Sequence, residues 1–151
     1  MKKAIVSILM LLFLFSGCSI HKNVPSFVEA QQIFEEYEAL MLTVTNYVQS
    51  LPYQKVYISS TNGVMQADLD YITIEDESVI DAIGVLLGSH TFECISKREN
   101  TVYFPIEYTF HECSSGIAFA MKEGDLPIVQ FMTECTSLGY SSWYYYVADY
   151  N

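Results

Sequence analysis

The sequence predicts an α+β domain in which two amphipathic helices pack on a curved, mainly antiparallel sheet. Apolar residues recur every three or four positions from Phe27 to Leu51, the spacing of a helix that buries one face. An Asn62-Gly63 pair lies between two apolar runs, as in a β-hairpin. From Thr91 onward, apolar and polar residues alternate as they do in half-buried strands.

The first helix is expected to begin after Ser26 and to end at Leu51. Ser26 and Glu29 form the S-x-x-E pattern of a capping box, and Pro52 disfavours helical backbone at Leu51. The apolar stripe consists of Phe27, Ala30, Phe34, Tyr37, Met41, Val44, Val48 and Leu51, widened by Ile33, Leu40 and Tyr47. So wide a stripe favours packing on the chain's own sheet. A coiled coil with a partner is the alternative.

A hairpin with a two-residue turn is expected at Asn62-Gly63. In that register the facing pairs are Val56 with Leu69, Ile58 with Ala67 and Lys55 with Asp70. A second helix is then expected to begin at Glu75 or Asp76 and to stop at Gly88. Its apolar face consists of Val79, Ile80, Ile83, Leu86 and Leu87.

The rest of the chain is expected to form strands. They are predicted at Thr91–Ser96, Thr101–Phe110, Gly116–Met121, Pro127–Cys135 and Ser142–Ala148. Turns are predicted at Arg98-Glu99-Asn100, at Glu123-Gly124-Asp125 and near Gly139. Because Pro105 has no amide hydrogen to donate, it indicates either an edge strand or a bulge.

This order of elements resembles the cone-shaped fold of the nuclear transport factor 2 and cystatin-like group. In that fold a curved sheet wraps a long N-terminal helix, so the resemblance implies a pocket between helix and sheet. It lies in element order alone and is carried by no sequence motif. The final stretch also resembles the tails of small uncharacterised lipoproteins of Gram-positive bacteria, which implies no specific activity.

The first eighteen residues have the features of an export leader. Met1-Lys2-Lys3 is basic, and Ala4–Phe15 is apolar but too short to cross a ~30 Å hydrocarbon core, which needs about 20 residues. Phe15-Ser16-Gly17-Cys18 resembles the lipobox of bacterial lipoproteins, although that family favours leucine where this chain has Phe15. The resemblance implies a diacylglyceryl group on the Cys18 sulfur and cleavage just before Cys18. A plain secretory leader is the alternative.

The lipobox resemblance divides the chain into three parts: a signal peptide (1–17), a lipidated tether (18–25) and a single α+β domain (26–151). It implies a location at the extracytoplasmic face of a bacterial cell membrane, with the acyl chains of Cys18 in the lipid bilayer. Two acyl chains hold a protein durably at a membrane, whereas one binds reversibly.

The chain is strongly acidic, with 7 Lys and Arg against 18 Asp and Glu. Loss of Lys2 and Lys3 with the leader leaves 5 against 18, a side-chain net charge of −13. Such a surface repels phosphate backbones and anionic lipid head groups, so we expect no nucleic-acid partner and a domain that stands away from the bilayer. A cationic partner is compatible with this charge, and so is a purely solubilising role.

Three cysteines remain after Cys18, namely Cys94, Cys113 and Cys135. An odd number outside the cell leaves at least one thiol unpaired. The sequence does not choose among the three pairings, and three buried thiols without any disulfide are the alternative.

Two polar clusters suggest chemistry at first sight, and we favour a structural role for both. His111-Glu112-Cys113 places a base near a thiol, but it runs into a turn and lacks the second histidine of an H-E-x-x-H zinc site. The acidic run comprises Asp68, Asp70, Glu75, Asp76, Glu77 and Asp81. Its spacing fails that of an EF-hand loop, so we expect a solvated surface and no metal. A weak cation site near the start of the helix is the alternative. No phosphate-binding loop, G-x-S-x-G or C-x-x-C motif occurs, so no cofactor is expected.

Aromatic residues concentrate in Trp143-Tyr144-Tyr145-Tyr146. Along a strand Trp143 and Tyr145 share one face, and Tyr144 and Tyr146 share the other. One face is expected to meet the core, and the second to be covered or to bind a protein, peptide or glycan. The ordinary preference of strands for tyrosine is the alternative explanation.

Together these observations predict a non-enzymatic lipoprotein that binds a partner or small ligand through the aromatic surface. One alternative is a pocket-based enzyme or ligand carrier, which needs polar groups such as His90, His111 or Glu107 to converge on a cavity. Another is an inhibitor or immunity-type protein that binds a basic partner through its acidity.

Overall fold

The computed structural model describes residues 24–108, 113–122 and 124–150. The predicted signal peptide and most of the tether, including Cys18, lie outside the described residues. His111 and Glu112 lie outside them too, as do the side chains of Glu107, Tyr108 and Cys113.

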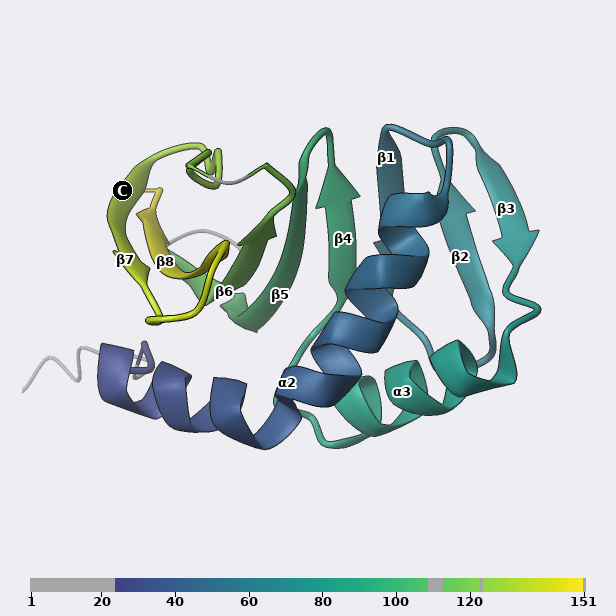
Figure 1. Ribbon diagram of the computed structural model, residues 1–151, viewed down its shortest axis with the longest axis horizontal. Helices are drawn as coiled ribbons and strands as arrows, with labels where there is room; N and C mark the ends of the chain where they lie inside the picture. The colour runs from purple at the N-terminus through teal and green to yellow at the C-terminus, as the bar shows by residue number, and fades with distance from the viewer. Residues whose placement is uncertain (1–23, 109–112, 123, 151) are drawn as a thin grey trace, which may run out of the picture.

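The α+β fold class is confirmed by two helices and one antiparallel sheet (Figure 1). The elements are α2 (Phe27–Ser50), β1 (Lys55–Ile58), β2 (Val64–Ala67), β3 (Asp70–Thr73), α3 (Glu77–Gly88), β4 (Ile95–Arg98), β5 (Thr101–Tyr108), β6 (Cys113–Ala120), β7 (Met132–Ser137) and β8 (Trp143–Asp149). The sheet has eight strands in the order β3-β2-β1-β4-β5-β6-β8-β7. It curves strongly, so that β5 to β8 turn around one end of the molecule (Figure 1).

The capping box predicted at the start of α2 is confirmed. The Glu29 carboxylate accepts the Ser26 backbone amide at 2.8 Å, and the Glu29 amide donates to the Ser26 hydroxyl oxygen at 3.4 Å. The hydrogen bond from the Ser26 amide lowers the pKa of Glu29. At the other end the helix stops at Ser50, and Leu51 is extended, as Pro52 predicts.

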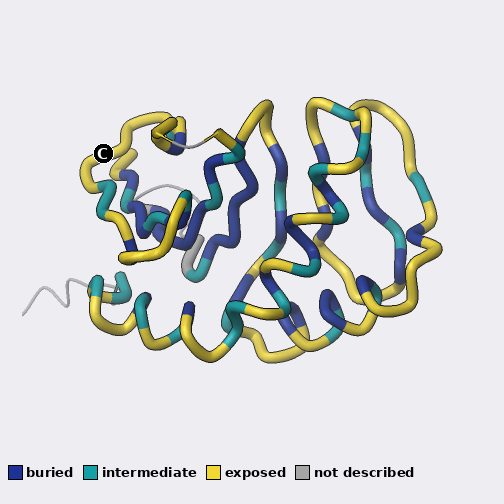
Figure 2. Tube along the Cα trace, in the orientation of Figure 1, coloured by how far each residue is buried: buried dark blue, intermediate teal, exposed yellow. Residues whose placement is uncertain are grey.

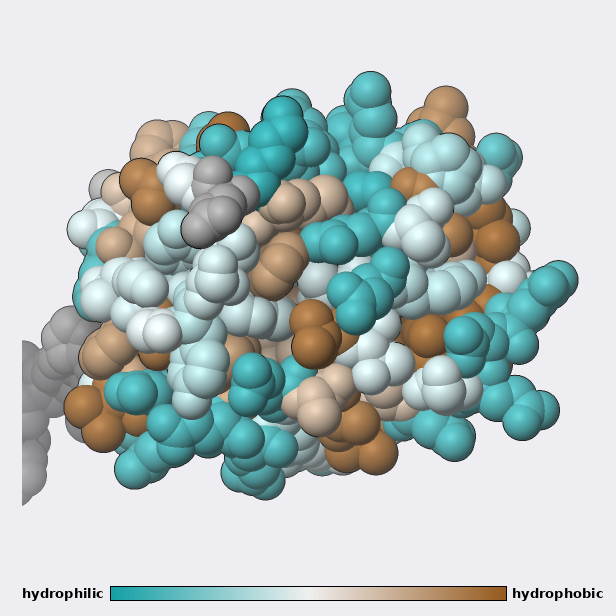
Figure 3. Space-filling view, in the orientation of Figure 1, coloured by the Kyte–Doolittle hydropathy of each residue, from teal (hydrophilic) through white to brown (hydrophobic). Residues whose placement is uncertain are grey.

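The apolar stripe of α2 packs on the chain's own sheet, as expected. Phe34 lies 5.0 Å from Trp143 between ring centroids, and Phe27 meets Tyr145 edge-on at 6.2 Å. The exposed side of the helix is polar, and Figure 3 shows hydrophilic residues along the lower edge of the molecule, over the first turns of α2. A wide buried face with a polar opposite face is the pattern of a helix packed on one domain.

A buried lysine holds the C-terminal end of α2, a feature that no local sequence signal predicts. The Lys97 ammonium, on β4, donates to the carbonyl oxygens of Val48 at 3.2 Å and of Leu51 at 3.1 Å. These are among the carbonyl groups that have no partner within a helix. Burial lowers the pKa of Lys97.

The register predicted for the first hairpin is wrong. Val56 pairs with Ala67, so β2 is displaced by two residues along β1 from its expected position. The chain turns again at Asp68 and Leu69 into an additional strand, β3, and Leu69 is 92% exposed. Asp68 permits this turn because it adopts a positive φ of 51°, which Asp tolerates better than most residues. Its carboxylate also accepts the amide of Lys55 at 2.9 Å.

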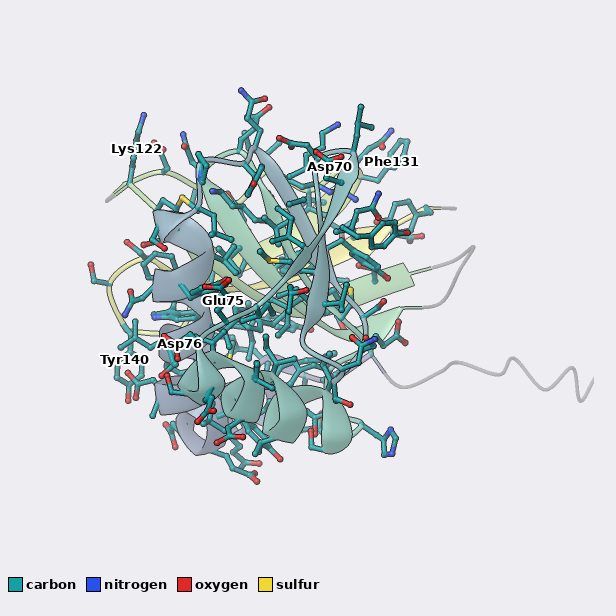
Figure 4. The ribbon with its side chains drawn as sticks, turned by 90° about the vertical axis from the view of Figure 1, so that its right-hand side faces the viewer. Asp70, Glu75, Asp76, Lys122, Phe131 and Tyr140 are labelled. Atoms are coloured by element: carbon teal, nitrogen blue, oxygen red, sulfur yellow. The ribbon has the colours of Figure 1, made fainter. Side chains whose placement is uncertain are left out.

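The second helix, α3, agrees with its prediction. Asp76 is the N-cap, and its carboxylate accepts the amides of Ser78 at 2.9 Å and Val79 at 3.3 Å. Figure 4 shows Asp76 and Glu75 at the start of the helix. The helix ends at Gly88, and the residue that takes the left-handed conformation beyond it is His90.

The later strands exist, with shifted boundaries. β4 begins at Ile95 instead of Thr91, and β7 begins at Met132 instead of Pro127. Pro105 marks a bulge on an interior strand, where the register with β6 shifts, and not a sheet edge. Figure 2 shows β5 and β6 buried along most of their length, because the curved sheet is covered there on both faces.

The space between the two helices and the sheet is filled by one core of buried side chains. Its largest members include Phe34, Met41, Phe104, Leu86 and Tyr145. The pocket implied there by the likeness to the cone-shaped folds is therefore occupied by the protein's own side chains. A groove lined by described residues lies on the opposite face of the sheet.

Candidate binding groove

A groove of about 560 Å³ crosses the sheet on the face opposite the helices. Six of its buried or half-buried lining residues are here called the floor: Cys94, Ser96, Tyr103, Pro105, Ser114 and Tyr146. Its exposed rim includes Lys55, Tyr57, Arg98, Glu93, Asp68 and Tyr150. One wall is made by Ile128, Val129 and Gln130.

Strand register brings these residues to one face. Tyr57 on β1 is directly opposite Ser96 on β4, and Ser96 is directly opposite Tyr103 on β5. Side chains directly opposite each other project from the same face of a sheet. Their neighbours Val56, Ile95 and Val102 project toward the helices and are buried in the core. The same alternation therefore builds the core on one face and the groove on the other.

The segment 127–131, here called the strap, crosses this face without forming a strand. The Tyr103 hydroxyl donates to the carbonyl oxygen of Ile128 at 2.8 Å, and Val129 packs against Tyr103 and Tyr146. The Asp149 amide donates to the carbonyl oxygen of Phe131 at 3.1 Å. The strap is thus held to the sheet at two points, on β5 and at the end of β8.

Two tyrosines form the centre of the floor. The rings of Tyr103 and Tyr146 meet edge-on with centroids 6.0 Å apart. Burial raises the pKa of both hydroxyls, and the effect is strong for Tyr146. Both side chains are therefore neutral at physiological pH. They are almost fully buried, and the Tyr103 hydroxyl is already donated to Ile128, so they form a closed base beneath the groove.

Cys94 adds a thiol to the floor, but not an activated one. Burial raises its pKa, an effect opposed in part by a hydrogen bond with Tyr57. Because the thiolate is the reactive form of cysteine, a raised pKa makes this thiol a weak nucleophile. Cys94 and Cys135 are both free thiols, so neither takes part in the disulfide considered from the sequence, and the side chain of Cys113 lies outside the described residues.

The charged residues of the groove are unevenly placed. Lys55 and Arg98 are directly opposite each other on β1 and β4, and both are exposed. Asp68 is next to Lys55, and its carboxylate accepts a hydrogen bond from the Lys55 backbone amide. Glu93 precedes β4, whereas Arg98 ends that strand, so the two lie at opposite ends of the groove along β4.

The aromatic surface predicted from Trp143, Tyr144, Tyr145 and Tyr146 requires correction. Trp143 and Tyr145 are 4% and 2% exposed and belong to the core between β8 and α2. The reason is that α2 covers this face of β8, where Phe34 packs against Trp143 and Phe27 meets Tyr145. Tyr144 is half-buried on the groove face without lining the groove, and Tyr146 is part of the floor.

The other candidate residues are not brought together. His90 is exposed after α3 and does not line the groove, and His111 lies outside the described residues. In the acidic run, Asp76 caps α3 and Asp68 binds the backbone of β1, while the remaining members are exposed. Within the described ranges, no three His, Cys, Asp or Glu side chains are grouped so as to hold a metal ion.

Comparisons of the chain with protein families, with curated proteins and with solved structures find no match. The helices within residues 24–108, 113–122 and 124–150 are all too short or too polar to span a bilayer.

Proposed function

We propose that the protein is a lipid-anchored binding protein on the extracytoplasmic face of a bacterial membrane, and that the tyrosine-lined groove is its ligand site. The single observation that supports a binding role is the groove itself, which is open on the sheet face that the helices leave uncovered. Its volume of about 560 Å³ falls within the ~300–1,000 Å³ typical of small-molecule sites.

The anchoring part of the proposal rests on Phe15-Ser16-Gly17-Cys18. Each methylene of an acyl chain buried in a bilayer contributes about 0.8 kcal/mol, so two chains on Cys18 suffice for stable attachment. The net charge of −13 opposes close contact between the domain and anionic lipids. A tethered domain held away from the surface leaves its groove accessible to solutes outside the cell.

The chemistry of the floor favours binding over catalysis. Tyr103, Tyr146 and Cys94 all have raised pKa values, so each stays protonated at neutral pH. Above this neutral floor, the exposed rings of Tyr57 and Tyr150 on the rim suit polar ligands that also have an apolar face. General base catalysis needs a group with a pKa near the working pH, and these three groups have been shifted away from it.

The anchor is tested by fractionation of cells that express the native chain or Cys18→Ala. The native protein is expected in the membrane fraction and the variant outside it. A Cys18→Ala protein that stays with the membrane contradicts the anchoring proposal.

The groove is tested by an array of saccharides and short peptides probed with the full-length protein in detergent. Ser96→Trp places a large ring in the floor and is expected to weaken every binding signal at least tenfold. Thr73→Trp is the matched control, because it adds the same ring at an exposed position of β3 outside the groove. Equal binding by both variants, with circular dichroism spectra unchanged, contradicts the assignment of the groove.

A further inference from the structure

The rim of the groove contains a pair of like charges that the fold does not require. Lys55 and Arg98 are directly opposite partners on β1 and β4, at exposed positions. Like charges in this arrangement destabilise a sheet by roughly 0.2–1 kcal/mol. Features that work against stability in a native fold concentrate at functional sites.

This pair is also unusual against the charge of the whole chain. The described residues contain four basic side chains, those of Lys55, Lys97, Arg98 and Lys122. Lys97 is buried on the helix side of the sheet, where it binds the end of α2. Phe131 is the last residue of the strap, and Lys122 projects outward on the side of the molecule away from Phe131 (Figure 4). Half of the described basic residues therefore meet at one position on the groove rim.

Two carboxylates line the same groove, and their placement leaves the basic pair able to receive a ligand. One oxygen of Asp68 accepts the backbone amide of Lys55. Glu93 lies beyond the other end of β4, where its amide donates to Pro105. Because Asp68 reduces the positive potential near Lys55, a singly charged anion matches the site better than a doubly charged one.

From this geometry we infer that the ligand is a carboxylated saccharide, whose carboxylate binds between Lys55 and Arg98 while its sugar ring lies along Tyr57 toward the floor. The inference rests on the proposed function, since it assigns a ligand class to the same groove. The guanidinium of Arg98 can bind a carboxylate with two parallel hydrogen bonds, and the ammonium of Lys55 adds a third donor.

Three features favour a saccharide over a peptide. The groove lies on a sheet face and not at an edge, because β1, β4, β5, β6 and β8 all have a neighbour on each side. The backbone groups of these strands are hydrogen-bonded to their neighbours within the sheet, so they cannot pair with an extended peptide. What the groove presents instead is the exposed rings of Tyr57 and Tyr150 on its rim and the amides of Gln66 and Gln130, which suit a ring that has both hydroxyls and an apolar face.

The experiment uses an array of matched neutral, carboxylated and phosphorylated mono- to tetrasaccharides, together with peptides rich in Asp and Glu, probed with the full-length protein in detergent. The carboxylated saccharides are expected to bind about tenfold or more tightly than their neutral counterparts. Lys55→Gln and Arg98→Gln are each expected to remove that difference. Lys122→Gln makes the same change in net charge away from the groove and is expected to preserve it.

The outcomes separate this inference from the proposed function. Equal binding of neutral and carboxylated saccharides overturns the anion site, yet leaves the groove as a binding site if Ser96→Trp abolishes the signal. Binding of phosphorylated saccharides alone or of acidic peptides alone overturns the assigned ligand class. If no saccharide or peptide on the array gives a binding signal that Ser96→Trp removes, both the inference and the groove assignment are overturned. Circular dichroism of each variant confirms that the fold is intact.

Discussion

The hydroxyl of Tyr145 donates a hydrogen bond to the carbonyl oxygen of Pro25. Strand β8, the last in chain order, therefore holds the segment that leads into α2. The Tyr145 ring also meets Phe27 edge-on at 6.2 Å. Pro25 is the last residue of the proposed tether, so this contact is where the anchored segment joins the folded domain.

Tyr145→Phe is expected to weaken this junction without disturbing the core. The substitution keeps the ring and removes the hydroxyl, which corresponds to about 1 kcal/mol of stability for one hydrogen bond. Chemical denaturation measures the loss, and hydrogen exchange is expected to become faster in the first turn of α2. Unchanged exchange there would show that the bond does not hold the junction.

Gly116→Ala is expected to destabilise the sheet at the bulge. A Cβ atom at Gly116 would lie 2.5 Å from the carbonyl oxygen of Phe104 and 2.8 Å from the Cα of Pro105, and backbone atoms cannot easily move away. We expect a loss of about 1–3 kcal/mol in the free energy of unfolding.

The matched control for that variant is Gly84→Ala in α3, where an added Cβ meets nothing within 4 Å. Because alanine favours helix over glycine, it is expected to raise stability by about 0.5–1 kcal/mol. Destabilisation by Gly84→Ala, or tolerance of Gly116→Ala, would contradict the packing described here.

Lys97→Met is expected to lower the free energy of unfolding by about 1–3 kcal/mol. The methionine fills the space of the lysine stem, but the carbonyl groups of Val48 and Leu51 lose their donor. Lys55→Met is the comparison on the other face of the sheet. It is expected to raise stability by a few tenths of a kcal/mol, because it relieves repulsion from Arg98. Denaturation curves in urea distinguish the two, and a stabilised Lys97→Met would show that the buried charge costs more than its hydrogen bonds contribute.

The decline of the free energy of unfolding at alkaline pH is expected to depend in part on Tyr146. An unfolded tyrosine ionises near pH ~10, whereas burial raises the pKa of Tyr146 in the folded state. As pH rises, the unfolded state therefore loses the Tyr146 hydroxyl proton before the folded state does. The contribution of Tyr146 to the free energy of unfolding is complete below pH ~10 and declines as pH rises above it.

The loss from this one group is expected to be about 1 kcal/mol at pH ~11. Urea denaturation at pH ~8 and ~11 is expected to show a smaller decline for Tyr146→Phe than for the native chain. Identical pH profiles for the two proteins would contradict the role assigned to Tyr146.

The helices were predictable because their signals are local. The Ser26 and Glu29 side chains form the capping box within one helical turn, and Pro52 acts on its immediate neighbour. The first hairpin was not predictable in register, because the turn at Asp68 is stabilised by the backbone of Lys55 on a different strand. Asn62-Gly63 is a strong local signal for a turn, but the contact between Asp68 and Lys55 goes with a register in which β2 is displaced along β1.

The groove was beyond prediction for a related reason. Its floor combines Ser96 and Tyr103, from the hairpin of β4 and β5, with Tyr146 from β8, which is distant in sequence. The strap that walls it has no periodic pattern. The aromatic cluster was a real signal of burial, yet Trp143 and Tyr145 could be assigned to the core only once α2 was known to cover their face of β8. Tyr57 and Arg98 carry no signal of their own, since only strand pairing makes them neighbours of the floor.

The most direct test of the central claim is chemical-shift mapping by nuclear magnetic resonance, using the full-length protein in detergent micelles titrated with a carboxylated saccharide that binds it on the array. The account predicts shifts concentrated at Tyr57, Ser96, Arg98 and Tyr103, on the sheet face away from the helices. Shifts confined to α2 and α3, with the groove residues unchanged at saturation, would contradict it.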